Sequence, residues 1–185
     1  WRGCLAGPVV AAAVILPEDF DFEIVKDSKQ LSEKKRKEAF DIIKEHALSI
    51  GIGWQTAGDV DQYNVLQATY NAMHKAIDGL EPDDEIKHLL IDGDRFNGYK
   101  NIKHTCVVKG DATYYSIAAA SIIAKVTRDE WMKIRAKEYP IYGWETNAGY
   151  GTKKHREAIV EHGTTSYHRM TFLGNILPKP AKKLF

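Results

Sequence analysis

The stretch LLIDGDRFNGYKNIKHTCVVKGDATYYSIAAASIIAKVTRDEW, residues 89–131, decides the fold of this chain. It holds two apolar runs, Leu89–Ile91 and Thr105–Val108, that are typical of buried strands, and each is soon followed by an acidic residue next to a glycine. Open α/β sheets place their chemistry in the crevice at the carboxyl ends of the strands. We therefore expect Asp92 and Asp111 to meet at such a sheet edge.

Two aspartates at neighbouring strand ends repel each other, and such a pair usually serves to hold a hard divalent cation. Magnesium prefers one or two carboxylates together with water and phosphate oxygens, so the pair predicts a metal site and a phosphate-bearing substrate. A purely structural interpretation stays open, in which Asp92 begins an Asp-Gly turn and Asp111 caps the helix that follows.

The composition suits one compact domain. The 185 residues are 44% hydrophobic, which is enough for a single core, and we expect one domain over residues 1–185. The two cysteines, Cys4 and Cys106, offer neither a disulfide framework nor metal-ligand spacing, which favours the reducing cytoplasm. No apolar run approaches the roughly 20 residues of a membrane span, and no signal peptide is visible. We expect a soluble monomer.

Charge is divided unevenly along the chain. Residues 149–185 hold seven Lys or Arg against two Glu, which gives this segment +5 and leaves −4 for the rest. A basic C-terminal segment on an acidic body suits a polyanion laid across a metal site, because phosphate contacts are largely made by Lys and Arg. A solvated helix face with a basic tail would give the same charges.

Hydrophobic patterns predict the remaining elements. We expect a continuous, doubly covered strand at Val9–Leu16 and an alternating strand at Leu48–Gln55. Ser32 is expected to cap a helix that runs to about residue 47, and Thr152 to cap another at Lys153–His162. Further helices are expected at residues 59–77, with a core stripe of Leu66, Tyr70, Met73 and Ile77, and at residues 112–137.

Three further side chains suggest substrate contacts. Ser121 and Lys125 lie one helical turn apart and can reach a phosphate near the aspartates, although a lysine on a helix is usually just solvated. Tyr150, between two glycines, can stack on a sugar or base, or can simply be a loop tyrosine.

Residues around Trp144 are expected to form a loop.

Seven motifs in order resemble those of bacterial ribonuclease HII, a member of the ribonuclease H-like superfamily, over nearly the whole chain. These are Arg2–Val10 (RGCLAGPVV), Asp27–Leu31 (DSKQL), Asp92–Arg95 (DGDR), Lys109–Asp111 (KGD), Ala119–Asp129 (AASIIAKVTRD), Gly149–His155 (GYGTKKH) and His168–Phe172 (HRMTF).

The resemblance implies an α/β fold, a mixed five-stranded sheet flanked by helices with a helical C-terminal segment. It also implies an endonuclease that hydrolyses the RNA strand of RNA–DNA hybrids and nicks 5′ of ribonucleotides embedded in duplex DNA. The products would carry a 3′-hydroxyl and a 5′-phosphate. Two Mg²⁺ or Mn²⁺ ions on four acidic residues would supply the chemistry.

The resemblance also assigns roles to residues. Asp92 and Asp111 match two of the four metal ligands. The Arg2-Gly3 turn looks like the backbone that contacts the 2′-hydroxyl, which distinguishes ribose from deoxyribose, and Tyr150 looks like the residue that stacks on the sugar. The residues that match positions around the phosphates are Ser28, Lys29, Ser121 and Lys125.

The chain departs from the family pattern at its start. The family's first motif is Asp-Glu-x-Gly-Arg-Gly, and Trp1 stands where the first glycine is expected. Two acidic ligands and the first central strand, expected between Val9–Leu16 and Leu89–Ile91, therefore have no counterpart here. We expect the natural gene to encode a further N-terminal segment, and we expect a chain without it to be a weak or inactive nuclease.

Other interpretations stay open. The chain could be an impaired module that binds RNA–DNA hybrids, or an unrelated magnesium-dependent phosphotransfer enzyme. Within the nucleases, ribonuclease HIII is a sibling, but the Arg2-Gly3 turn favours ribonuclease HII. The final residues, Lys182-Lys183-Leu184-Phe185, faintly resemble a tail that binds a sliding clamp.

Overall fold

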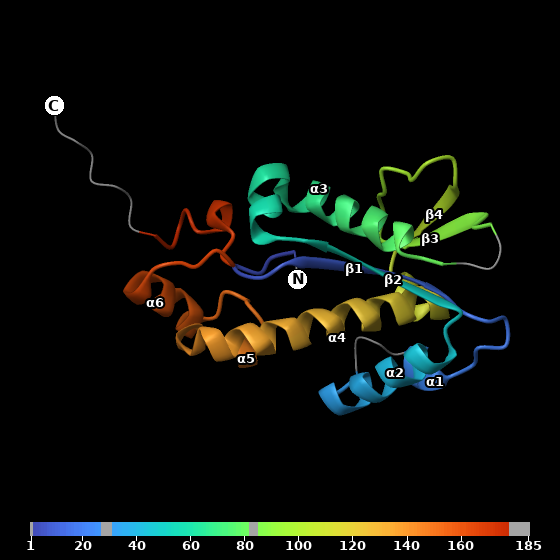
Figure 1. Cartoon of the computed structure of the whole chain (residues 1–185), viewed down its shortest axis with the longest axis horizontal. Coiled ribbons are helices and arrows are strands. Elements are labelled where there is room, and N and C mark those ends of the chain that lie inside the picture. Colours follow the sequence, from blue (N-terminus) through green and yellow to red (C-terminus); the bar gives the residue numbers. More distant parts are fainter. Residues whose placement is uncertain (1, 27–30, 82–84, 178–185) are drawn as a thin grey trace. The chain divides into compact units, whose positions relative to one another are not determined.

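The computed structural model describes residues 2–26, 31–81 and 85–177, which are drawn in colour in Figure 1. The chain divides into two compact units. The terminal unit comprises residues 1–9, 55–68 and 129–185, and the strand unit comprises residues 10–54 and 69–128. The single catalytic domain expected from the sequence stays a prediction.

Strands and helices alternate along the chain, which confirms the predicted α/β class. The strands are β1 (Val9–Ile15), β2 (Ser49–Gln55), β3 (His88–Asp92) and β4 (Lys103–Val107). The helices are α1 (Glu23–Lys26), α2 (Glu33–His46), α3 (Ala57–Asp78), α4 (Tyr115–Glu138), α5 (Trp144–Asn147) and α6 (Lys153–His162). Short 3-10 turns are η1 (Gly110–Ala112), η2 (Pro140–Tyr142) and η3 (Met170–Phe172). No helix in the described part of the chain is long and apolar enough to cross a bilayer.

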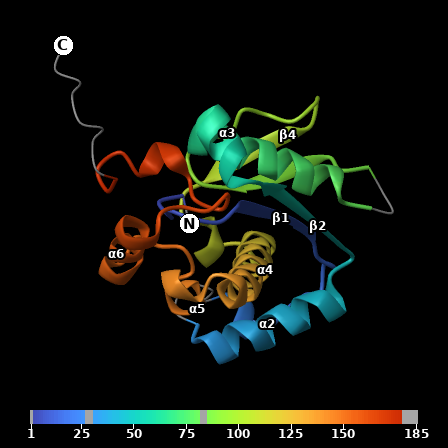
Figure 2. The ribbon, with the colours of Figure 1, turned by 60° about the vertical axis from the view of Figure 1, so that its left-hand side comes forward.

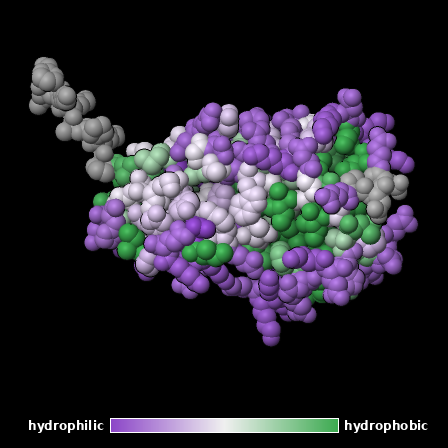
Figure 3. Space-filling model, viewed as in Figure 1, coloured by the Kyte–Doolittle hydropathy of each residue, from purple (hydrophilic) through white to green (hydrophobic). Residues whose placement is uncertain are grey.

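The strands pair as two two-stranded sheets within the described residues, β1 with β2 and β3 with β4. The β3–β4 pair is parallel, and its register sets Asp92 opposite Val107. Strand β1 is buried at Val9 and Val10 but only half-buried from residue 11 onward, so the expectation of cover on both faces is wrong in the part described. In the space-filling view, apolar side chains gather over the region where Figure 1 labels strand β1 (Figure 3).

Strand β4 is more exposed than its apolar sequence predicts. Lys103, His104 and Thr105 are exposed, and the strand ends at Val107, which leaves Val108 68% exposed. The run that was predicted as a buried strand is therefore covered only in part. Strand β3 alternates instead, with Leu89 and Ile91 buried on one face.

Small residues bring the elements of the strand unit close together. The buried alanines of α4 pack beside α2, and the two helices lie side by side in Figures 1 and 2. On β2, an added Cβ at Gly51 or Gly53 would lie 1.9 Å from a backbone oxygen of α3. Only glycine permits this approach, because real Cβ atoms do not come so near to backbone. The shared core cluster of the two helices is Ala39, Phe40, Ile43, Ala118, Ala119, Ile122, Ile123 and Val126, with Phe20 and Val25.

Helix α3 bends at Asn64, which the sequence pattern did not predict. Asn64 has φ 65° and ψ 162°, and its Oδ1 accepts hydrogen bonds from the N–H groups of Leu66 and Gln67. The helix thus restarts at residue 64 with a new phase. Consequently Leu66 is 41% exposed, contrary to the predicted stripe, whereas Tyr70 and Ile77 are buried.

The terminal unit has an aromatic core around Trp144. The predicted loop at this place is wrong, because η2 and α5 form there and Trp144 is fully buried, stacked on Tyr142 at 5.1 Å between ring centroids. Thr152 caps α6 as predicted, accepting a 3.3 Å hydrogen bond from the N–H of His155. Ser32 likewise caps α2 in the strand unit, through the N–H of Lys35.

Candidate active site

The two predicted metal ligands lie at one end of the β3–β4 pair, in the strand unit. Asp92 is the last residue of β3 and is exposed, and the following N–H, of Gly93, donates a 3.0 Å hydrogen bond to the carbonyl oxygen of Val107. Asp111 lies in η1, just after β4, and is 3% exposed. Strand β3 contacts η1, so both carboxylates belong to the same sheet end.

One glycine and one left-handed residue create the turn that carries Asp111. Lys109 adopts φ 57° and ψ 38°, and an added Cβ at Gly110 would lie 2.5 Å from Cδ1 of Ile117. The long helix therefore begins at Tyr115 rather than at the predicted residue 112. The structural alternative for Asp111, capping of that helix, stays open, although the helix begins four residues after it.

The donor set fits a hard cation. Carboxylate oxygens are the ligands that Mg²⁺ and Mn²⁺ favour. Within the described ranges no group of three or more His, Cys, Asp and Glu side chains could hold a metal ion. If Asp92 and Asp111 hold a cation as predicted, water and phosphate oxygens would have to complete its ligands, as Mg²⁺ commonly allows.

Other predicted phosphate contacts of the strand unit lie on α4. Ser121 and Lys125 are half-buried, one turn apart, on the helix that η1 leads into. Ser28 and Lys29 lie outside the described residues. The role of each of these four residues stays a prediction.

The terminal unit brings together the residues predicted to contact the ribose. Arg2 and Gly3 are exposed in the first turn, and Tyr150 is 41% exposed in its loop. The carbonyl oxygen of Gly149 accepts hydrogen bonds from the N–H groups of Leu5 (2.8 Å) and Ala6 (3.2 Å). Gly149 has φ 83°, and a Cβ there would lie 2.3 Å from the carbonyl oxygen of Ala6, so the two segments touch through backbone.

Arg169 was not singled out from the sequence, although it lies in the last quoted motif. Its side chain is fully buried, and its guanidinium donates to three carbonyl oxygens of the first turn. Nη1 donates to Arg2 (3.0 Å), Nε and Nη2 donate to Gly7 (3.1 and 3.0 Å), and Nη2 also donates to Pro8 (3.2 Å). Backbone carbonyls carry no sequence signal, so only the presence of an arginine between the aromatic residues Tyr167 and Phe172 could have indicated this role.

A pair of buried histidines supports the Tyr150 loop. His155 donates from Nδ1 to the carbonyl oxygen of Tyr150 (2.8 Å), and its Nε2 accepts from Nε1 of Trp144 (3.0 Å). The Nε2 atoms of His155 and His168 are 3.2 Å apart. Burial lowers the pKa of His155, and burial together with the neighbouring His155 lowers the pKa of His168 to about 4. Both rings are therefore neutral near pH 7.

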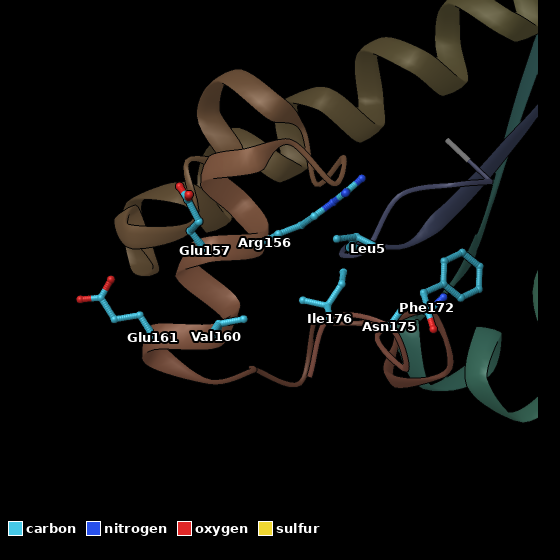
Figure 4. A pocket seen from close by; sticks show the side chains of 8 residues that line it. All are labelled: Leu5, Arg156, Glu157, Val160, Glu161, Phe172, Asn175 and Ile176. Carbon is cyan, nitrogen blue, oxygen red and sulfur yellow. The ribbon is translucent and has the colours of Figure 1, made fainter. Parts of the chain in front are cut away.

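A cavity of about 620 Å³ opens beside α6 in the terminal unit (Figure 4). Its lining consists of Leu5, Arg156, Glu157, Val160, Glu161, Phe172, Asn175 and Ile176. This set includes none of the residues predicted to bind metal or substrate. The predicted chemistry is therefore placed at a strand end and on exposed loops rather than in this cavity.

Comparisons with known proteins point to one family. A family model described as Ribonuclease HII matches residues 2–174. The Ribonuclease HII of Bacteroides thetaiotaomicron is 56% identical over 171 residues, which cover 92% of this chain and 84% of that protein.

Solved structures agree on the fold. The ribonuclease H2 of Pyrococcus horikoshii has a TM-score of 0.75 at 25% identity, covering 92% of this chain and 89% of that one. The RNase HII in a PCNA:RNase HII complex from Archaeoglobus fulgidus has a TM-score of 0.71 at 21% identity, covering 99% and 96%. A Bst-RNase HIII in complex with Mn²⁺ has a TM-score of 0.70 at 20% identity, but only 63% of that chain is covered. The last two show the fold alone.

Proposed function

The chain belongs to the ribonuclease HII family, and from this premise we propose that it nicks duplex DNA on the 5′ side of embedded ribonucleotides. It is a ribonuclease H, an endonuclease for the RNA of RNA–DNA hybrids. The finer proposal adds the products, a 3′-hydroxyl and a 5′-phosphate, and the dependence on Mg²⁺ or Mn²⁺.

One observation carries the proposal. Asp92 and Asp111 follow neighbouring parallel strands and lie at the same end of the pair, where strand β3 contacts η1. We assign the metal to these two carboxylates, since hard oxygen donors are what Mg²⁺ and Mn²⁺ require. When bound, two such ions would activate water and stabilise the leaving oxygen.

The chain's own residues bind and orient the substrate in this proposal. The backbone of the Arg2-Gly3 turn contacts the 2′-hydroxyl, the group that only ribose carries. Tyr150 stacks on the sugar from its exposed loop. Ser121 and Lys125 bind the phosphates near the aspartates, and Ser28 and Lys29 contribute to the same contacts.

The alternative of a catalytically impaired hybrid-binding module is not favoured. A relative that matches 92% of this chain is named as the enzyme, Ribonuclease HII. Family membership likewise argues against an unrelated phosphotransfer enzyme. Between the siblings, the Ribonuclease HII family model over residues 2–174 and the 56% identity to a Ribonuclease HII favour ribonuclease HII, as the Arg2-Gly3 turn does.

A labelled DNA duplex with one ribonucleotide, incubated with Mg²⁺ or Mn²⁺ and the protein as its natural gene encodes it, tests the proposal. We expect a single nick on the 5′ side of the ribonucleotide, and no nick in the all-DNA duplex. Tight binding without a nick would support the hybrid-binding module instead. If the duplex is neither bound nor nicked, both the nuclease and the hybrid-binding module are contradicted.

We also propose that the tail, residues 182–185, binds a sliding clamp. The RNase HII of Archaeoglobus fulgidus forms a complex with PCNA, and the tail of the present chain lies outside the described residues. Deletion of Leu184 and Phe185 should abolish capture by an immobilised bacterial clamp, and unchanged capture would refute the assignment. The cytoplasm stays the expected compartment, consistent with the free thiols of Cys4 and Cys106, and the monomer stays a prediction.

A further inference from the structure

The two segments that would contact the ribose are joined by a continuous set of hydrogen bonds inside the terminal unit. Gly149, next to Tyr150, accepts from Leu5 and Ala6, and the carbonyl oxygen of Leu5 accepts a 2.8 Å hydrogen bond from the N–H of Arg169. The N–H of Gly7 donates to the carbonyl oxygen of Tyr167 at 2.8 Å. The first turn, the Tyr150 loop and the Tyr167–Arg169 segment therefore hold one another through backbone.

Arg169 holds the first turn in place through its guanidinium group. Its donors reach the carbonyl oxygens of Arg2, Gly7 and Pro8, and the side chain is fully buried. A planar guanidinium directs its N–H groups along fixed lines, whereas a lysine ammonium is a single point of charge. The position of the Arg2 carbonyl is thereby tied to that of the buried guanidinium.

His155 holds the Tyr150 loop in place in a similar way, through a hydrogen bond to a backbone carbonyl oxygen. Because its Nδ1 donates to the Tyr150 carbonyl, its Nε2 carries the lone pair that accepts from Trp144. His168 must then donate from its Nε2, and its Nδ1 accepts from the N–H of Thr165 at 3.0 Å. Each ring nitrogen acts either as a donor or as an acceptor, as the neutral form requires. The contacts at Nε2 therefore fix the orientation of the His155 ring and keep its Nδ1–H directed at the Tyr150 carbonyl oxygen.

We propose that Arg169 and His155 are positioning residues, which hold the Arg2-Gly3 turn and Tyr150 in one fixed arrangement so that together they recognise a ribose. This inference rests on the proposed function of those two elements. Neither residue touches the substrate, because both are buried. Their contribution is preorganisation, which raises affinity by removing the cost of ordering the loops on binding.

Two substitutions at position 155 separate positioning from general stability. Asparagine carries an N–H at the place of the histidine Nδ1, so His155→Asn can keep the bond to the Tyr150 carbonyl and loses only the Nε2 contacts. His155→Leu loses both. The matched control is Tyr142→Phe, which removes a 2.9 Å hydrogen bond to the carbonyl oxygen of Gly163 from the same aromatic cluster without reaching the loop.

The readout is the binding preference of the full chain for a duplex with one ribonucleotide over the same all-DNA duplex, measured by fluorescence anisotropy. We expect His155→Leu to lower this preference about tenfold, the size of one lost stacking contact. His155→Asn and Tyr142→Phe should stay within about twofold of the wild type, a change well below the effect of a lost contact. Arg169→Lys should lower the preference as His155→Leu does.

A double-mutant cycle shows whether His155 acts through Tyr150. If it does, adding His155→Leu to Tyr150→Ala lowers the preference no further, because the side chain that it positions is already gone. Additive losses would overturn the proposal. So would an equal loss in His155→Asn and His155→Leu.

Amide hydrogen exchange tests the positioning without the substrate. The N–H groups of Leu5 and Ala6 report on the junction directly, and their exchange should be faster in His155→Leu than in Tyr142→Phe. Equal exchange in the two variants would refute the positioning role. A wild type that binds both duplexes equally, with the exchange difference present, would refute the proposed function and leave the positioning role standing.

Discussion

The terminal unit and the strand unit place their functional residues by different physical means. In the terminal unit, buried polar side chains such as Arg169 and His155 hold backbone carbonyls of exposed loops. In the strand unit, strand register and glycine turns set Asp92 and Asp111, while close backbone contacts at Gly51 and Gly53 bring β2 against α3. The terminal unit is therefore sensitive to loss of donors, and the strand unit to added volume.

The largest effect should follow removal of the buried guanidinium. Arg169→Leu leaves three carbonyl oxygens of the first turn without their donor, and we expect the free energy of unfolding to fall by about 3–5 kcal/mol. Urea unfolding measures it. As the control, Arg156→Leu changes an exposed arginine of α6 and should alter stability by less than about 0.5 kcal/mol. Similar losses in both variants would contradict the buried role of Arg169.

The strand unit should respond instead to a single methyl group. Gly53→Ala puts a Cβ 1.9 Å from the carbonyl oxygen of Ala72, and because that atom is backbone, relief requires β2 and α3 to separate. We expect a loss of about 3 kcal/mol in urea unfolding. Gly174→Ala, where an added Cβ meets nothing within 4 Å, should be close to neutral. A stable Gly53→Ala variant would show that the approach of β2 to α3 is not tight.

Mild acid should act on the terminal unit through its histidines. Burial lowers the pKa of His168 to about 4, against about 6.5 in an unfolded chain. Between these two pH values the unfolded chain binds more protons than the folded chain does. The contribution of His168 to the free energy of unfolding is therefore complete above pH 6.5 and is lost toward pH 4, by about 2–3 kcal/mol. In His168→Gln the difference between urea unfolding at pH 7 and at pH 4.5 should shrink. An unchanged pH dependence would refute this source of acid sensitivity.

Removal of a helix-capping side chain should have the smallest effect on stability, and the loss should be equal in the two units. Thr152 and Ser32 each cap a helix through a 3.3 Å hydrogen bond, in the terminal and the strand unit respectively. Alanine at either position should cost about 1 kcal/mol in thermal or urea unfolding. A much larger loss for Thr152→Ala would mean that this cap also supports the Tyr150 loop, and would sharpen the contrast between the units.

The same contrast explains what could be predicted from the sequence. Hydrophobic period and cap residues are local signals, so β2, α2 and α6 were predicted within a few residues. The strand-end position of Asp92 also follows from a local pattern, an apolar run before Asp-Gly.

Long-range or backbone-mediated features were missed. The partners of Arg169 are carbonyl oxygens of residues 2, 7 and 8, and carbonyls look alike in every sequence. The bend at Asn64 shifted the helical phase, which made the prediction for Leu66 wrong. The burial of Trp144 and the exposure of β4 depend on how distant segments pack, which local periodicity does not encode.

Calorimetric titration of Mn²⁺ into the full chain shows whether Asp92 and Asp111 jointly bind a metal. We expect saturable binding in the wild type and its loss in both Asp92→Asn and Asp111→Asn. Asp94→Asn, which changes an exposed neighbour that pairs with Arg95, should bind as the wild type does. Unchanged Mn²⁺ binding in either Asp92→Asn or Asp111→Asn would contradict the claim.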